Sequence, residues 1–162
     1  MRLAVVALLM LGGCGANPAK PPAPDAATAG LRGAAAPNSP DARAAMATVE
    51  RYFSHLKARD YAAAYRMWDD GGRAAAPNLA AFTQGFAPYA IYEPTAGRPT
   101  AVTVRGREQY VLVSASLYVK RRNGDSADRD GSVMLRRSID PQDPDAAKRD
   151  WRIWATDIRA RS

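Results

Sequence analysis

Few side chains in this 162-residue sequence could do chemistry, and three deserve a test. Cys14 is the only cysteine, so it cannot close an intrachain disulfide, but its thiolate would be a nucleophile open to alkylation. His55 is the only histidine, which excludes a His-rich metal site and leaves a general base conceivable. Asp157 lies in a predicted strand, where an inward-pointing carboxyl group could act as an acid–base group.

His55 and Asp157 each have a simpler structural interpretation, which we favour. His55 falls on the flank of a predicted helix near Arg59, where a boundary histidine is common. Strand alternation puts Asp157 on one face with Ile153 and Ala155, yet an ion pair with an arginine at the sheet edge is the commoner arrangement. The sequence has no Gly-rich phosphate loop and no serine nucleophile elbow. We therefore predict a protein that is not an enzyme and uses no metal or cofactor.

The residues before Cys14 have the layout of an export signal. Arg2 forms a short positive segment, and Leu3–Leu11 is a continuous apolar run of nine residues. A helix of that length spans only about 14 Å, whereas the apolar core of a bilayer is about 30 Å thick. The segment is therefore predicted to be a secretory signal peptide rather than a membrane span.

The four residues Leu11, Gly12, Gly13 and Cys14 resemble the lipobox of bacterial lipoproteins. The resemblance implies that residues 1–13 are removed and that Cys14 receives a diacylglycerol thioether and usually an N-acyl chain such as palmitate. Two or more acyl chains hold a protein stably on a membrane. An Asp after the cysteine favours the inner membrane in enteric lipoproteins. The glycine found here therefore favours the periplasmic face of the outer membrane.

A flexible tether is predicted to follow the anchor. Residues 15–39 contain five Pro, nine Ala, three Gly and no aromatic residue, and Leu31 is their single large aliphatic. Such a composition cannot bury enough apolar surface to offset the entropy lost on ordering. We therefore assign residues 14–39 to the lipidated cysteine and its tether.

The composition changes sharply after the tether. All thirteen aromatic residues lie between Tyr52 and Trp154. About 120 residues are enough for one hydrophobic core. The prediction is a single globular domain over residues 40–160, followed by a short tail at 161–162.

The formal net charge is +7, which could indicate nucleic acid or anionic lipid as a partner. An exported protein has little access to nucleic acid, so that partner is not expected. Most arginines are scattered, and the dense cluster at Lys120–Arg122 is followed by Asp125, Asp128 and Asp130. We interpret the charge as a solvated, arginine-rich surface.

Helices are predicted in the first half of the domain. Ser39 is a candidate N-cap for a helix that starts at Pro40, and Asp60 can cap the next. The second helix is expected to run through Trp68 to a pair of glycines. A third, short helix is expected after Asn78.

In the second half of the domain, apolar and polar residues alternate with the two-residue period of β-strands. Alternating patterns predict four strands: Thr100–Gly106, Gln109–Lys120, Ser132–Ile139 and Trp151–Ile158. The connections are polar and rich in turn residues, so neighbouring strands should pair as antiparallel hairpins. Helices followed by strands predict an α+β fold, with helices packed on one face of an antiparallel sheet.

This order resembles the nuclear-transport-factor-2-like superfamily, a cone-shaped α+β fold shared with ketosteroid isomerase and scytalone dehydratase. The resemblance rests on the two helices within Val49–Trp68 and on the closing strand "DWRIWATDI". It implies N-terminal helices on a curved sheet. Members include enzymes and non-catalytic domains, and sheet-to-sheet dimers are common among them, so the fold alone does not decide the function.

The leading hypothesis is a non-catalytic, lipid-anchored domain of the cell envelope that binds an envelope protein or a small ligand. One alternative is an isomerase or dehydratase that uses Asp157 or His55 with a tyrosine. Another is a structural spacer that forms a homodimer through the Tyr110–Tyr118 face of the sheet. Five aromatic residues are candidates to line a pocket: Tyr52, Tyr65, Trp68, Tyr118 and Trp154.

Overall fold

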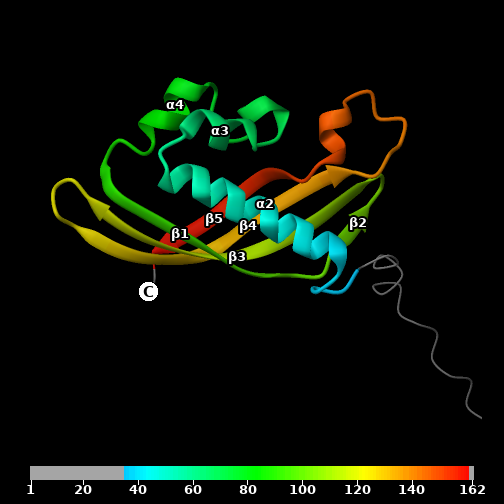
Figure 1. Ribbon diagram of the computed structural model, residues 1–162, viewed down its shortest axis with the longest axis horizontal. Helices are drawn as coiled ribbons and strands as arrows, with labels where there is room; N and C mark the ends of the chain where they lie inside the picture. The colour runs from blue at the N-terminus through cyan, green and yellow to red at the C-terminus, as the bar shows by residue number, and fades with distance from the viewer. Residues whose placement is uncertain (1–34, 161–162) are drawn as a thin grey trace, which may run out of the picture.

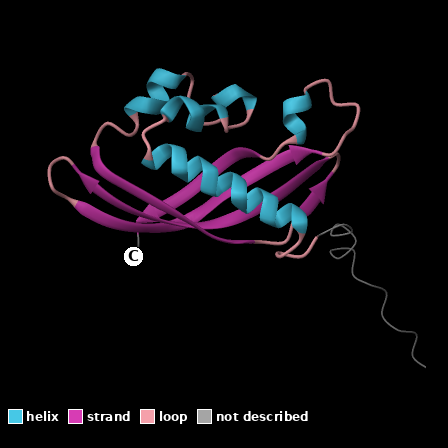
Figure 2. Cartoon of the chain, viewed as in Figure 1, coloured by secondary structure: helices cyan, strands magenta, loops and turns pink. Residues whose placement is uncertain are grey.

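The computed structural model describes residues 35–160, which fold into helices on one face of a curved, open antiparallel sheet (Figures 1 and 2). The predicted α+β class is confirmed. The helical elements are α2 (Pro40–Lys57), α3 (Tyr61–Arg66), η1 (Asp70–Gly72), α4 (Leu79–Gln84) and η2 (Ala146–Arg149). The strands are β1 (Tyr89–Pro99), β2 (Thr103–Arg105), β3 (Glu108–Arg121), β4 (Ser126–Ser138) and β5 (Arg152–Ala160).

The sheet has the strand order β1-β3-β4-β5, and β2 also pairs with β3. All the pairs are antiparallel, which confirms the predicted hairpins. The β3–β4 hairpin is the longest ladder and runs from Glu108 opposite Ser138 to Lys120 opposite Ser126. Gly124 in its turn has a φ of 99°, a conformation that favours glycine.

Each predicted N-cap residue forms the expected capping hydrogen bond. The side-chain oxygens of Ser39, Asp60 and Asn78 each accept a hydrogen bond from the backbone N–H three residues later, at 3.2, 3.0 and 2.9 Å respectively. These bonds satisfy helix-end donors that have no partner within the helix. Local capping therefore fixes where α2, α3 and α4 begin.

The second helix is shorter than predicted because the backbone after it forms hydrogen bonds with the edge of the sheet instead. It ends at Arg66 instead of continuing through Trp68. The Asp69 N–H donates to the Ile153 carbonyl at 2.8 Å, and the Ile153 N–H donates to the Met67 carbonyl at 3.1 Å. Residues 67–69 thus run alongside the start of β5, in a parallel bridge that helical geometry would not allow.

Two strand boundaries also differ from the predictions. β1 was not predicted. It carries Pro94, Gly97 and Pro99, which are uncommon within strands, and the prolines are tolerated because β1 is an edge strand. β4 starts at Ser126 rather than Ser132, since the polar segment before Ser132 pairs with β3 along its whole length.

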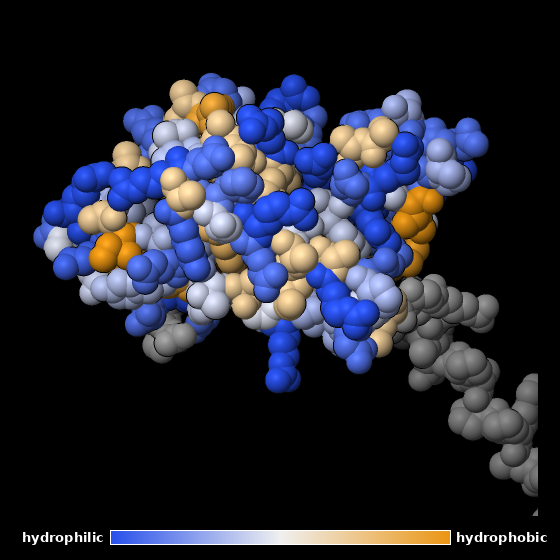
Figure 3. Space-filling view, viewed as in Figure 1, coloured by the Kyte–Doolittle hydropathy of each residue, from blue (hydrophilic) through white to orange (hydrophobic). Residues whose placement is uncertain are grey.

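The core lies between α2 and the covered face of the sheet. α2 contributes a buried stripe that includes Val49, Phe53 and Leu56. The strands contribute Val111, Val113, Val133, Leu135 and Ile153, each at most 2 % exposed. Burying one such side chain contributes about 1.5–3 kcal/mol. The outer surface of the domain is mainly hydrophilic in the view of Figure 3, with hydrophobic side chains in small separate groups.

Packing of the domain reaches further back than the predicted boundary at residue 40. Ala35 and Val102 form an antiparallel bridge, with both N–H···O distances 2.9 Å, and Ala35 packs against the core. At least residues 35–39 of the predicted tether therefore belong with the domain. The predicted signal peptide and the predicted lipobox with Cys14 lie outside the described residues. No helix between residues 35 and 160 is long and apolar enough to cross a membrane.

Candidate functional site

Asp157 points away from the core, contrary to the prediction that it shares a face with Ile153. Leu135 pairs with Ile153 and Met134 with Ala155, so Trp154 is an extra residue in β5. A bulge of this kind exchanges the two faces for every residue after it. Asp157 is therefore exposed on the open face of the sheet, where it forms an ion pair with Arg159 at 2.6 Å.

His55 lies near the C-terminal end of α2, about one-third exposed. Its Nδ1 is 3.5 Å from Oδ2 of Asp60, the residue that caps α3. The histidine lines a groove between α2 and β5, whereas Asp157 is on the other face of the sheet. The structure does not bring these two candidate acid–base groups together.

Three of the five candidate pocket aromatics pack as part of the core. Tyr52 and Trp68 are buried and meet edge to face, with ring centroids 6.0 Å apart. Burial raises the pKa of Tyr52, so its hydroxyl stays neutral. The Tyr65 ring lies over Gly72, and its hydroxyl donates to the Ala76 carbonyl at 3.1 Å.

The other two candidates, Tyr118 and Trp154, lie on the open face of the sheet, which none of the helices within residues 35–160 covers (Figure 2). Trp154 is 42 % exposed, and its ring meets that of Tyr110 at a centroid distance of 5.7 Å. The guanidinium carbon of Arg136 stands 5.4 Å from the centroid of the Trp154 ring, within the range of a cation–π contact.

An apolar depression of about 320 Å³ lies beside Trp154, and we call it the aromatic groove. Its floor comes from β3 and β4 through Leu112 and Met134, and its far side comes from the segment that leads into β2. The residues that line it are Thr100, Ala101, Thr103, Arg105, Tyr110, Val111, Leu112, Met134 and Trp154.

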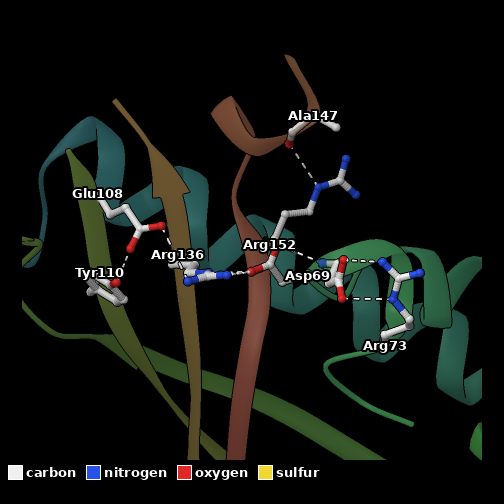
Figure 4. Close-up of polar contacts among 8 residues, drawn as sticks. Asp69, Arg73, Glu108, Tyr110, Arg136, Ala147 and Arg152 are labelled. Carbon is white, nitrogen blue, oxygen red and sulfur yellow. Dashed lines mark hydrogen bonds and ion pairs between the residues drawn. The ribbon is translucent and has the colours of Figure 1, made fainter. Parts of the chain in front are cut away.

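A network of polar contacts fixes the side chains at one end of the aromatic groove (Figure 4). Arg136 forms an ion pair with Asp69 through two guanidinium nitrogens, and its third nitrogen is 3.5 Å from Glu108. Tyr110 donates its hydroxyl hydrogen to Glu108. Because β4 lies between β3 and β5, Arg136 can reach acids that come from either side of it.

The chemistry of this network suits binding better than proton transfer. The hydrogen bond to Glu108 is the largest cause of a raised pKa for Tyr110, which therefore remains a neutral phenol. Arg136 stays charged at any physiological pH. Asp69 is almost fully buried, and an unpaired carboxylate there would be costly, so Arg136 is held firmly in place.

Sequence reasoning selected Trp154 but missed Asp69 and Arg136. The alternation of β4 places Met134 and Arg136 on one face, and that signal was available. The partner of Arg136 could not be predicted in this way. Asp69 was expected near a helix end, and it reaches the sheet only through the pairing of residues 67–69. Comparison with protein-family models and with curated proteins gave no match for the chain.

Proposed function

We propose that this chain is a lipid-anchored protein of the cell envelope whose domain binds a protein partner through the aromatic groove. The anchor rests on the lipobox-like residues Leu11 to Cys14. We further propose that the domain is a member of the nuclear-transport-factor-2-like superfamily. Two helices followed by long, curved antiparallel strands support that assignment.

The observation that carries the binding proposal is Trp154, exposed on an uncovered sheet face and fixed by its neighbours. Trp, Tyr and Arg are the residues most enriched where binding energy concentrates in interfaces. A side chain that is already held in its bound orientation loses little entropy on binding. Tyr110 and Arg136 provide that restraint here.

The chemistry of the groove indicates the kind of partner. Leu112, Met134 and Trp154 present apolar surface, while Arg105 lines the rim and has no ionic partner among the described residues. The complementary surface would offer apolar side chains beside a carboxylate. We therefore propose a protein segment of that composition as the partner.

The test places a photo-crosslinking amino acid at Leu112 in the full chain, in its native membranes, with the same group at Glu50, an exposed position on α2, as a control. The expected result is an adduct of defined mass from position 112 that disappears in the Trp154→Ala variant. An adduct at twice the mass of the chain would identify the partner as a second copy. Equal labelling from positions 112 and 50 would contradict the binding proposal.

The anchor is tested separately with Cys14→Ser. This substitution removes the thiolate that would be acylated, so the variant should accumulate as unprocessed precursor and leave the detergent phase on phase partitioning. A processed variant that still partitions with detergent would show that the lipobox interpretation is wrong.

A further inference from the structure

A second concave surface lies on the other side of the sheet, between α2 and the connection from β4 to β5. It encloses about 600 Å³, the largest volume of the grooves described for this domain. We call it the cationic groove, and six side chains define it: Arg51, His55, Arg137, Arg149, Trp151 and Arg152. They come from α2, β4, η2, β5 and the residue before β5, so α2 is brought to residues about one hundred positions later in the sequence.

The positive charge in this groove is only partly compensated. Four arginines line it, and Asp150 is the single acid among the lining residues. Arg137 is paired with Asp41 at 2.8 Å, outside the groove lining. The remaining three arginines therefore face one carboxylate.

The partners of those three arginines are neutral or missing. Arg149 donates to the backbone carbonyl of Asp143 at 3.2 Å, and Arg152 donates to the carbonyls of Arg66 and Ala147 at 2.9 and 3.2 Å. These carbonyls orient the guanidinium groups without cancelling their charge. Within residues 35–160 the Arg51 side chain has no hydrogen-bonding or ionic partner. Each arginine keeps free N–H donors.

The floor and one wall of the groove are apolar or small. Trp151 is buried, and Arg137 stacks over its ring at 4.8 Å from the centroid. Met67 also contributes, and the α2 wall carries Ala47 one turn and Ala44 two turns before Arg51, where longer side chains would fill the space. The groove thus combines an open volume with oriented guanidinium groups around it.

We infer that the cationic groove binds a phosphate group, with Arg51, Arg149 and Arg152 as the ligating side chains. The planar fork of arginine matches the geometry of phosphate oxygens and favours it over a simple point charge. The group can be free phosphate or the headgroup of an anionic lipid, since both present the same oxygens. This inference is independent of the aromatic groove and of its partner.

The three tryptophans allow a site-specific test, because each reports on a different place. Trp151 lines the cationic groove, Trp154 lies on the open sheet face and Trp68 is in the core. The full chain, labelled with 5-fluorotryptophan and solubilised in dodecyl maltoside, is followed by ¹⁹F NMR. The signals are assigned with the Trp151→Phe and Trp154→Phe variants.

Two titrations distinguish the sources of the phosphate group. One uses inorganic phosphate, and the other uses phosphatidylglycerol in mixed micelles, with phosphatidylcholine as its zwitterionic control. A saturable shift of the Trp151 signal alone, with inorganic phosphate or with phosphatidylglycerol but not with phosphatidylcholine, supports the inference and names the source. No shift of Trp151 in either titration, or equal shifts of all three signals, overturns it.

A charge-matched pair of variants completes the test. Arg51→Gln with Arg149→Gln should weaken binding by about tenfold or more, because charge-assisted hydrogen bonds to phosphate are lost. The control is Lys120→Gln with Arg121→Gln, which removes the same charge from the end of β3 and should leave the affinity unchanged. All four side chains are exposed, so folding should survive, as the unchanged Trp68 signal will show. An equal loss in both variants would mean non-specific charge attraction and would overturn the inference.

Discussion

The two faces of the sheet are built from the same strands and differ in what they carry. On the covered face, β-branched and aliphatic side chains such as Val113, Val133 and Ile153 are fully buried under α2. On the open face, alternate positions carry Tyr110 and Met134, and Trp154 lies beside them, partly exposed. The covered face accounts for stability, whereas the open face keeps ordered aromatic surface available. Strand alternation thus separates the packed core from the surface that we propose for binding within one sheet.

Two tryptophans make this comparison testable with a single residue type. Trp68 belongs to the covered side and Trp154 to the open side, and both contact an aromatic neighbour. They differ in exposure, 7 % against 42 %. If burial is what separates the faces, the same truncation should have very different consequences at the two positions.

The largest effect is expected for Trp68→Ala. Removal of this buried ring should lower the free energy of unfolding by about 3–5 kcal/mol, a large share of the roughly 5–15 kcal/mol typical of a domain. Urea unfolding followed by circular dichroism measures the loss. A Trp68→Ala variant as stable as the parent chain would refute the assignment of Trp68 to the core.

Arg136→Gln should have the next largest effect, although Arg136 is on the open face. The substitution leaves the buried Asp69 carboxylate without its cation, which should cost about 2–4 kcal/mol of unfolding free energy. Arg159→Gln breaks an exposed ion pair and should change stability by less than about 0.5 kcal/mol. The double variant Arg136→Gln, Asp69→Asn should recover part of the loss. Additive losses would mean that the two side chains do not depend on each other.

Trp154→Ala is expected to change the free energy of unfolding by no more than about 1 kcal/mol, because most of what it loses is a partly solvated aromatic contact. Its binding effect should be large by contrast, as the crosslinking experiment measures. Thermal unfolding of this variant beside Trp68→Ala gives the direct comparison. A destabilisation as large as that of Trp68→Ala would remove the distinction between the faces.

The smallest effects are expected for His55→Gln and Asp157→Asn, each within about 0.5–1 kcal/mol of the parent chain. His55 is on a groove wall and Asp157 forms an exposed pair, so neither is strained by burial. Chemical denaturation of both variants measures the change in the free energy of unfolding. A clear stabilisation by Asp157→Asn, above about 1.5 kcal/mol, would indicate a functional acid held at a cost and would revive the enzyme hypothesis.

Local signals in the sequence predicted much of the fold. The caps at Ser39, Asp60 and Asn78 form as predicted, and the alternation of β3 places each side chain on its expected face. These features depend on residues close together in the chain, where spacing and side-chain type determine the geometry.

Features set by distant contacts could not be predicted in the same way. The end of α3 depends on the free edge of β5, and the orientation of Asp157 depends on one extra residue at Trp154. The cationic groove shows the same limit. Arg51 is about one hundred residues from Arg149 and Arg152 in the sequence, and only the fold brings α2 and the residues around the start of β5 to one groove.

The edges of the sheet bear on aggregation, which matters if the proposed lipid anchor holds many copies of the chain on one membrane. The outer strand β1 carries Pro94 and Pro99 and shifts register at both ends, so it offers an interrupted row of backbone donors. At the opposite edge, residues 67–69 occupy the start of β5. Strand-by-strand polymerisation needs a long, regular, vacant edge. Regular strand addition is therefore disfavoured at β1 and at the start of β5.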